Sequence, residues 1–160
     1  MTIQVGDRIP EATLTKATAD GPQPVGTGEF FAGRKVALFA VPGAFTPTCS
    51  ARHLPGYVEK ADELKGKGVD EVAAVSVNDV FVMGAWGKAG GADGKVTMLA
   101  DGNGDFVEAL GLSADFSKFG MGKRSQRWSA IVDDGVVTEL NVEEPGAFSV
   151  SSAEYMLGQL

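Results

Sequence analysis

Apolar residues in this chain form short continuous runs that alternate with segments of helical period. The runs at 35–41 (KVALFAV) and 71–77 (EVAAVSV) predict strands buried on both faces, and 96–100 predicts a third strand. Two further runs, 128–132 and 136–142, flank the sequence Asp-Asp-Gly, which favours a tight turn between antiparallel strands. The pattern therefore predicts buried central strands and a hairpin near the end of the chain.

Helical periods fall between these strands. One helix presents a single apolar face and ends near Gly66 and Gly68; its apolar positions are Leu54, Tyr57, Val58, Ala61 and Leu64. Asp79 can cap a second helix and Asp105 a short third one, while Ser151 and Glu154 have the spacing of a capping box. This order of elements predicts an α/β, thioredoxin-like fold with a mixed central β-sheet flanked by helices.

The composition is that of an ordinary globular protein. The 160 residues are 44% hydrophobic and 22% charged, which predicts one domain spanning 1–160, with the Gly/Pro-rich stretch 21–28 as an early loop. An excess of 21 acidic over 14 basic residues argues against a nucleic-acid surface. No segment resembles a secretion signal, and the longest apolar run, 36–45, is far short of the ~20 residues that cross a bilayer. We therefore expect a cytoplasmic protein that binds neither nucleic acid nor membranes.

The one cysteine of the chain, Cys49, lies where a helix is expected to start. A single thiol cannot form an internal disulfide, so it is either buried and inert or placed to react. Pro47 favours the first helical position, which makes Thr46 the N-cap and puts Cys49 in the first turn. Free backbone N–H groups and the helix dipole there favour the thiolate, the nucleophilic form of cysteine.

The residues around Cys49 resemble a known motif. Pro42, Thr46 and Cys49 follow the pattern Pro-x-x-x-Thr-x-x-Cys of peroxiredoxins, and the string at 39–56 (FAVPGAFTPTCSARHLPG) resembles their type II, or peroxiredoxin-five, branch. The similarity continues in order through SVND (76–79), FVMGAW (81–86), LADGNGDF (99–106), RSQRWSAIVDDG (124–135) and NVEEPGAF (141–148). The resemblance implies a thiol-dependent peroxidase that reduces hydrogen peroxide or organic hydroperoxides and forms a homodimer.

The resemblance also implies roles for individual residues. Cys49 would attack the peroxide and become a sulfenic acid, Thr46 would hydrogen-bond sulfur and peroxide, and Pro42 would shield the sulfur from water. Arg127 would stabilise the thiolate and the charge that develops on the peroxide oxygens. Further candidates would line or neighbour an apolar substrate pocket: Phe45, Leu112, Phe119 and Arg124. No metal or other cofactor is expected.

Some members of this branch carry a second, resolving cysteine. The two regions where it would stand, 73–75 and 149–151, contain none in this chain. The sulfenic acid must therefore be reduced by an outside thiol. The resemblance suggests glutathione with glutaredoxin and, as a weaker candidate, thioredoxin.

The same residues allow other interpretations. His53, the one histidine, could serve a Cys–His hydrolase, but Pro55 disturbs the helix and no acidic partner is evident in the sequence. We therefore expect a structural or supporting role for His53. A thioredoxin-like redox-sensing or chaperone module without efficient turnover stays open. A dithiol oxidoreductase is disfavoured, because Thr46 stands where a CxxC motif needs its first cysteine.

Overall fold

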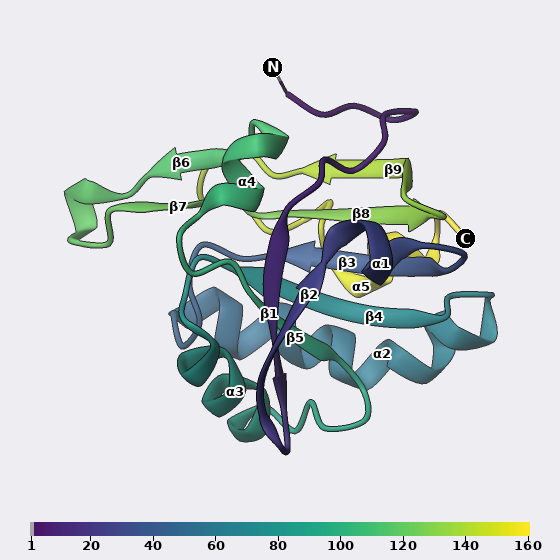
Figure 1. Cartoon of the computed structure of the whole chain (residues 1–160), viewed down its shortest axis with the longest axis horizontal. Coiled ribbons are helices and arrows are strands. Elements are labelled where there is room, and N and C mark those ends of the chain that lie inside the picture. Colours follow the sequence, from purple (N-terminus) through teal and green to yellow (C-terminus); the bar gives the residue numbers. More distant parts are fainter. Residues whose placement is uncertain (1) are drawn as a thin grey trace.

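A seven-stranded mixed β-sheet forms the centre of the computed structural model, which describes residues 2–160 (Figure 1). The strands lie in the order β2-β1-β5-β4-β3-β8-β9. They are β1 (Thr13–Thr18), β2 (Gly21–Gly26), β3 (Lys35–Ala40), β4 (Glu71–Ser76), β5 (Thr97–Ala100), β8 (Trp128–Asp133) and β9 (Val136–Val142). β3, β4 and β5 are parallel, so the loops that follow them meet at one edge of the sheet.

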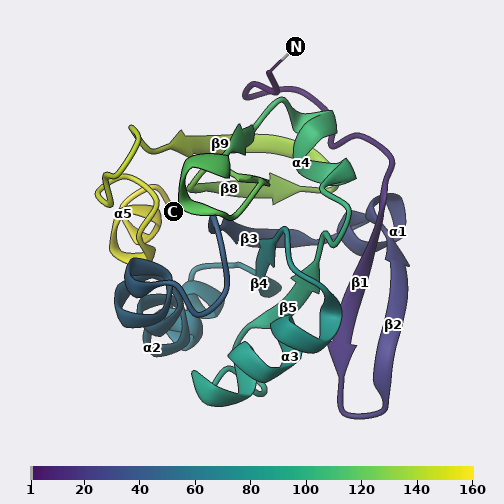
Figure 2. The same cartoon turned by 90° about the vertical axis from the view of Figure 1, so that its left-hand side faces the viewer.

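Helices cover both faces of the sheet (Figure 2). They are α1 (Thr27–Phe31), α2 (Leu54–Gly66), α3 (Val80–Ala89), α4 (Asp105–Leu110) and α5 (Ala153–Leu157). Residues of α2, α3 and α5 share one buried cluster, and residues of α1 and α4 share the other. Side chains of β3 alternate between the two, with Ala37 and Phe39 in the first cluster and Val36 and Leu38 in the second. The sheet is therefore buried on both sides at its centre.

The three continuous apolar runs form β3, β4 and β5, as the sequence pattern predicts. The predicted hairpin is β8–β9, and its turn holds Asp134 and Gly135 at φ values of 49° and 81°. Both values lie in the left-handed region, which glycine and aspartate adopt more readily than most residues. The expected α/β fold with a mixed central sheet flanked by helices is confirmed.

The stretch 21–28 differs from its prediction as a loop. It contains β2, which pairs with β1 along its whole length. Pro22 and Pro24 cannot donate a strand hydrogen bond, but β2 is an edge strand with one side unpaired. The prolines therefore fit a position that the pattern of turn residues did not reveal.

Helix caps agree with the sequence in one case and shift in another. Asp79 caps α3 as predicted, because its carboxylate accepts a hydrogen bond from Val82 N at 2.8 Å. Asp105 is instead the first residue of α4, and the carboxylate of Asp101 accepts the hydrogen bond from Phe106 N at 3.1 Å. The cap therefore reaches α4 from the end of β5.

The cap of α5 lies one residue later than predicted. The hydroxyl of Ser152 accepts a hydrogen bond from Tyr155 N at 3.2 Å, so Ser152 is the N-cap. The hydroxyl of Ser151 donates to the buried carboxylate of Glu143 instead. The contact with Glu143 thus uses the hydroxyl of Ser151, the residue that the capping-box spacing predicted as the N-cap.

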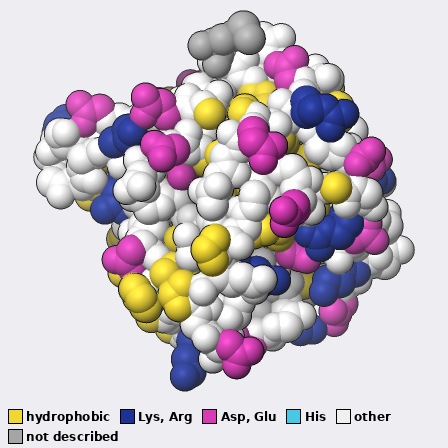
Figure 3. Space-filling view, in the orientation of Figure 1, with side chains coloured by type: hydrophobic (Ala, Val, Ile, Leu, Met, Phe, Trp, Pro, Cys, Tyr) yellow, Lys and Arg dark blue, Asp and Glu magenta, His cyan; other side chains and the backbone are white. Residues whose placement is uncertain are grey.

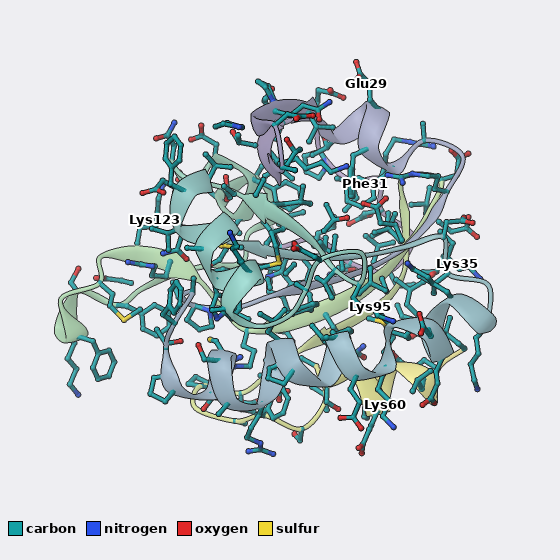
Figure 4. All side chains as sticks on the ribbon, turned by 90° about the horizontal axis from the view of Figure 1, so that it is seen from below. Glu29, Phe31, Lys35, Lys60, Lys95 and Lys123 are labelled. Carbon is teal, nitrogen blue, oxygen red and sulfur yellow. The ribbon has the colours of Figure 1, made fainter. Side chains whose placement is uncertain are left out.

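A small hairpin projects from the body of the molecule (Figure 1). It consists of β6 (Ser113–Asp115) and β7 (Lys123–Ser125), joined through a 3₁₀ turn, η2 (Ser117–Phe119). At its root, Lys123 forms an ion pair with Glu108 of α4. Figure 4 shows Lys123 on this side of the molecule, and Lys35, Lys60 and Lys95 toward the opposite end.

The surface carries one apolar area that is visible over α3. In Figure 3, hydrophobic side chains gather at the lower left, where Figure 1 places this helix. Phe81 of α3 is 73% exposed. Between residues 2 and 160, no helix combines the length and the apolar character that a bilayer crossing requires.

Candidate active site

The helix that carries Cys49 begins at Pro47, as the sequence predicts. Ser50 N donates to the carbonyl of Thr46 at 2.9 Å, which closes the first turn. The next residues, Cys49–His53, form a π-helical segment, η1, in which Leu54 N donates to the carbonyl of Cys49. Pro55 follows directly and has no N–H to continue an ordinary α-helical pattern. An irregular turn thus lies at the cysteine, a common position for π-segments at functional sites.

Arg127 contacts the sulfur of Cys49. Its Nη2 donates to Sγ at 3.0 Å, and the cysteine is fully buried. The two residues meet because Cys49 follows β3 while Arg127 precedes β8, and the register of these strands pairs Ala40 with Trp128. A guanidinium is permanently charged, so this hydrogen bond brings a fixed positive charge to the sulfur.

His53 lies on the other side of the guanidinium. Its Nδ1 is 2.7 Å from Nη1 of Arg127, and its Nε2 is 3.0 Å from the carbonyl oxygen of Ser151. Burial of the ring, reinforced by the charge of Arg127, lowers the pKa of His53 to about 3. The imidazole is therefore neutral at physiological pH, with Nδ1 accepting from Arg127 and the Nε2 proton donated to Ser151.

Loop 143–151 joins β9 to α5 and is closed by a buried carboxylate. Glu143 accepts hydrogen bonds from Ser149 N at 2.7 Å, from Ser151 N at 2.8 Å and from the Ser151 hydroxyl at 2.7 Å. Burial tends to raise the pKa of Glu143, but these hydrogen bonds outweigh it and hold the pKa below its usual value. Glu143 N donates to the carbonyl of Arg127 at 3.0 Å, which fixes the loop to the start of β8.

Loop 41–46 follows β3 on the other side of Cys49. The amide oxygen of Asn78 accepts from Ala44 N at 3.0 Å and from the Ser76 hydroxyl at 2.7 Å. Within the loop, the Thr46 hydroxyl donates to the carbonyl of Gly43 at 2.7 Å. The lone pairs of that hydroxyl stay available as acceptors. The predicted contact of Thr46 with the substrate stays a prediction.

A cavity of about 530 Å³ lies beside Arg127. Pro42 and Thr48 line it on the side of Cys49, residues 114–116 on the side of the β6–β7 hairpin, and residues 144–147 on the side of loop 143–151. Alanine, phenylalanine, proline and glycine contribute much of this lining. Pro42 is one of the lining residues, and its expected role of shielding the sulfur stays a prediction.

The four residues expected around a substrate pocket differ in exposure and contacts, and their place at such a pocket stays a prediction. Leu112 is 2% exposed and packs in the core, whereas Phe45 and Phe119 are 54% and 67% exposed. Arg124 donates from Nη1 to the carbonyl of Val77 at 3.1 Å. None of the four is among the described residues that line the cavity. Residue spacing could not reveal this, because the path of the β6–β7 hairpin sets which side chains face Arg127.

The sequence does not predict three of the residues at the site as site residues, although it favours one of them, Ser151, as a helix cap. Asn78 lies in the SVND segment, Glu143 in the NVEEPGAF segment, and Ser151 just beyond it. A buried role for a charged residue such as Glu143 is invisible to hydrophobic periodicity. The resembling segments include Asn78 and Glu143 but end before Ser151. Within residues 2–160, no group of three or more His, Cys, Asp or Glu side chains is placed to hold a metal ion.

The chain is similar in sequence to several known proteins. The sequence matches the family described as Redoxin over residues 4–157. It is 56% identical over 164 residues to peroxiredoxin-2E-2, chloroplastic, of Oryza sativa subsp. japonica, covering 99% of this chain and 73% of that one. It is 49% identical over 159 residues to peroxiredoxin-2B of Arabidopsis thaliana, covering 99% and 98%.

A solved structure extends the similarity to three dimensions. The crystal structure of reduced Prx3 from Vibrio vulnificus in complex with H₂O₂ superposes with a TM-score of 0.95, at 56% sequence identity and 99% coverage of both chains. The thioredoxin-like fold and the arginine-bound thiol thus define the class of thiol peroxidases. The chain belongs to the redoxin family, and within it to the peroxiredoxins.

Proposed function

We propose that this peroxiredoxin reduces hydrogen peroxide and organic hydroperoxides through a Cys49 sulfenic acid that glutathione and glutaredoxin then reduce. The thiolate sulfur attacks one peroxide oxygen, and an S–O bond forms as the O–O bond breaks. The other oxygen leaves as hydroxide or alkoxide and takes up a proton, giving water or an alcohol. The sulfur is oxidised by two electrons, and the peroxide is reduced by two.

The observation that carries this proposal is the 3.0 Å hydrogen bond from Arg127 to the sulfur of Cys49. The same guanidinium borders the cavity, so it can stabilise the thiolate and the charge that moves onto the peroxide oxygens. The hydroxyl of Thr46 can accept a hydrogen bond from a peroxide O–H. These groups supply the electrostatic stabilisation that ionisation of the thiol alone does not provide.

The need for an external reductant follows from the thiol count, and the resemblance to peroxiredoxins suggests glutathione with glutaredoxin. Cys49 is the one cysteine in the sequence, so an external thiol must attack the sulfenic sulfur. A glutathione thiolate would form a mixed disulfide with Cys49 and release water. A glutaredoxin thiol would then take over the glutathione and free Cys49, and a second glutathione would regenerate glutaredoxin with release of glutathione disulfide.

Peroxide consumption tests this proposal directly. Wild type and Cys49→Ser are compared with glutathione alone, with glutathione and a dithiol glutaredoxin, and with thioredoxin and its reductase. We expect turnover by the wild type chiefly in the glutaredoxin arm, none by Cys49→Ser, and one glutathione bound to Cys49 by mass spectrometry when glutaredoxin is omitted. Equal turnover by both proteins would remove Cys49 from the mechanism, and faster turnover with thioredoxin would overturn the reductant.

A single-turnover measurement separates the enzyme from a redox-sensing or chaperone module. Trp86 Nε1 donates to the hydroxyl of Ser50, the residue that follows Cys49, at 3.0 Å. The fluorescence of this tryptophan can therefore report the oxidation of Cys49. The enzyme requires oxidation of Cys49 by peroxide far faster than that of a free thiol. A rate equal to that of free cysteine would favour the sensing module.

We also propose that the protein is a homodimer, as in many peroxiredoxins that it resembles. The apolar area over α3 supports this, because Phe81 is 73% exposed and lies next to Val80 and Val82. Sedimentation of wild type and Phe81→Glu tests the proposal. We expect a dimer that the charged variant weakens, and a wild-type monomer at micromolar concentration would overturn it.

A further inference from the structure

A second hollow, a polar groove of about 360 Å³, lies between the helix that follows Cys49 and the start of α5. Two cations, Arg52 and Lys60, and two carboxylates, Glu59 and Glu154, are among its lining residues. The groove thus offers charges of both signs to a small ligand, and the steps of peroxide reduction described so far do not use it.

Arg52 is the cation of the groove that has no carboxylate partner. None of the ion pairs found within residues 2–160 includes Arg52, whereas Lys60 pairs with Glu63 at 3.6 Å. The guanidinium carbon of Arg52 lies 4.6 Å from the ring centroid of Phe148, and the side chain is exposed. Stacking on the ring fixes the plane of the guanidinium, and this planar fork can bind a carboxylate through two parallel hydrogen bonds.

Phe148 connects this groove with the active site. The same ring lies 5.8 Å from the guanidinium carbon of Arg127, whose Nη2 contacts the sulfur of Cys49 at 3.0 Å. Arg52 also follows Cys49 by three positions within one helical segment, a spacing that places two side chains next to each other on a helix. Since one residue of an extended chain spans about 3.5 Å, a tripeptide attached to the sulfur can reach Arg52.

The cavity on the other side of the sulfur is less suited to an anion. Cys49 is fully buried, so a glutathione attached to it must extend into a neighbouring space. Three acidic residues, Asp115, Glu143 and Glu144, line the cavity, and its one cationic lining residue, Arg127, already contacts the sulfur. Like charges repel, so this cavity disfavours a molecule with two carboxylates.

We propose that the groove binds the glutathione that reduces the Cys49 sulfenic acid, with Arg52 holding one of its carboxylates. Glutathione carries two carboxylates and one ammonium, and the groove has two cations and two carboxylates to receive them. Arg52 contacts the reductant and not the peroxide. This inference rests on the proposed glutathione-dependent function, and it deepens that function by giving the reductant a site.

The step that the groove serves is the formation of the mixed disulfide. The glutathione thiolate attacks the sulfenic sulfur of Cys49, and an S–S bond forms as the S–O bond breaks. Hydroxide leaves and takes up a proton to give water. The sulfur of Cys49 is reduced and that of glutathione is oxidised, so the electrons balance.

Substitutions of Arg52 separate its charge from its shape. Arg52→Gln removes the charge, and Arg52→Lys keeps it without the planar fork. Arg8→Gln is the matched control, because Arg8 is also exposed and its loss changes the net charge by the same amount. Each protein is oxidised by one equivalent of hydrogen peroxide and mixed with glutathione or with 2-mercaptoethanol, a thiol without charged groups. Rapid quenching and mass spectrometry give the rate of mixed-disulfide formation.

We expect Arg52→Gln to react with glutathione roughly 3- to 10-fold more slowly than the wild type, the effect of losing a charge-assisted hydrogen bond at an exposed site. Arg52→Lys should lose less than about 3-fold, and Arg8→Gln less than about 2-fold. All of these proteins should react alike with 2-mercaptoethanol and should be oxidised by peroxide at the wild-type rate. The difference between wild type and Arg52→Gln should shrink in 1 M salt, about which the Debye length is only ~3 Å.

A rate with glutathione that Arg52→Gln leaves unchanged, or a loss that 2-mercaptoethanol or Arg8→Gln shares, would overturn the groove as the glutathione site. A wild-type protein that peroxide oxidises no faster than free cysteine, or whose oxidised form gives no mixed disulfide with glutathione, would instead overturn the proposed function. The two failures are therefore distinguishable within one series of measurements.

Discussion

Two loops flank Cys49, and they are held by groups of different charge. Loop 41–46 is fixed by the neutral amide of Asn78, whereas loop 143–151 is fixed by the buried carboxylate of Glu143. Each loop also lies against an arginine: a Cβ on Gly43 would come within 3.2 Å of Arg124 Nη1, and Glu143 N bonds the carbonyl of Arg127. The charged group that holds a loop, the carboxylate of Glu143, thus belongs to the loop beside Arg127, the arginine that faces the sulfur.

The arginines beside the two loops, Arg124 and Arg127, differ in their hydrogen-bond partners. Arg124 donates to the backbone carbonyls of Val77 and Met121, so its donors hold the chain in place. Arg127 has Cys49 and His53 as side-chain partners. Two arginines only three positions apart therefore have separate tasks. Arg124 meets the carbonyls of Val77, just after β4, and of Met121, whereas Arg127 meets the sulfur and the histidine of the cysteine helix.

Replacing each arginine by glutamine should give the largest difference between the two regions, measured as the rate of Cys49 oxidation. We expect Arg127→Gln to slow oxidation of Cys49 by roughly 10²- to 10³-fold, the loss typical of a removed transition-state donor. Arg124→Gln should slow it by less than about 5-fold, since its donors do not face the reacting atoms. Stopped-flow fluorescence with hydrogen peroxide measures both, and similar losses in the two variants would contradict the division of tasks.

Replacing the two residues that hold the loops, Glu143 and Asn78, should lower the free energy of unfolding by different amounts. Glu143→Ala should lower the free energy of unfolding by about 3–4 kcal/mol, because several buried donors lose a charged acceptor. Asn78→Ala removes a neutral acceptor from two donors and should cost about 1–2 kcal/mol. Urea unfolding at neutral pH gives both values. A larger cost for Asn78→Ala would show that loop 41–46 is the more tightly held.

Because His53 is neutral in the folded protein, the site beside loop 143–151 makes the free energy of unfolding depend on pH, which loop 41–46 does not. Its pKa falls from 6.5 to about 3 on folding, so the unfolded chain binds a proton that the folded protein excludes. The resulting stability is fully present above the unfolded pKa and is lost progressively as pH falls toward the folded one.

Between pH 7.5 and pH 5, this exclusion should lower the free energy of unfolding by about 2 kcal/mol relative to the His53→Asn variant. Denaturant titrations of both proteins at several pH values measure the difference. Parallel curves for wild type and variant across this range would show that His53 titrates alike in the folded and unfolded states.

The smallest effects concern the backbone of the two loops. Phe45 of loop 41–46 has φ 64° and Gly146 of loop 143–151 has φ 79°, both in the left-handed region. Gly146→Ala should destabilise by about 1 kcal/mol, because a Cβ is disfavoured there. Phe45→Gly should stabilise slightly, by about 0.5 kcal/mol, since relief of strain exceeds the added entropy of the unfolded chain. Melting curves of both variants test the opposite signs.

The part of the fold that the sequence predicts depends on local signals. The apolar runs of β3, β4 and β5, the Asp-Asp-Gly turn of β8–β9 and the cap of α3 each need only a few neighbouring residues. The β2 strand escaped prediction, because an edge strand tolerates the prolines and glycines that elsewhere indicate a loop. The cap of α5 escaped because Glu143 takes the hydroxyl of Ser151.

At the site, the sequence by itself predicts the nucleophile and determines its setting at the start of a helix. Pro47 and Thr46 start a helix at Cys49, and the absence of another cysteine requires an external reductant. These statements involve residues within a few positions of one another, or a simple count. Dihedral preferences and capping act over that range, so the sequence carries them without knowledge of the fold.

Only the tertiary structure decided how the arginine is held and where the cavity lies. The contacts of Arg127 with Cys49 and His53 span 78 and 74 positions of the chain, and that of His53 with Ser151 spans 98. Such contacts depend on the register between β3 and β8 and on the return of the chain after β9. No local preference encodes them, since they form only when the whole sheet has brought these segments to one edge.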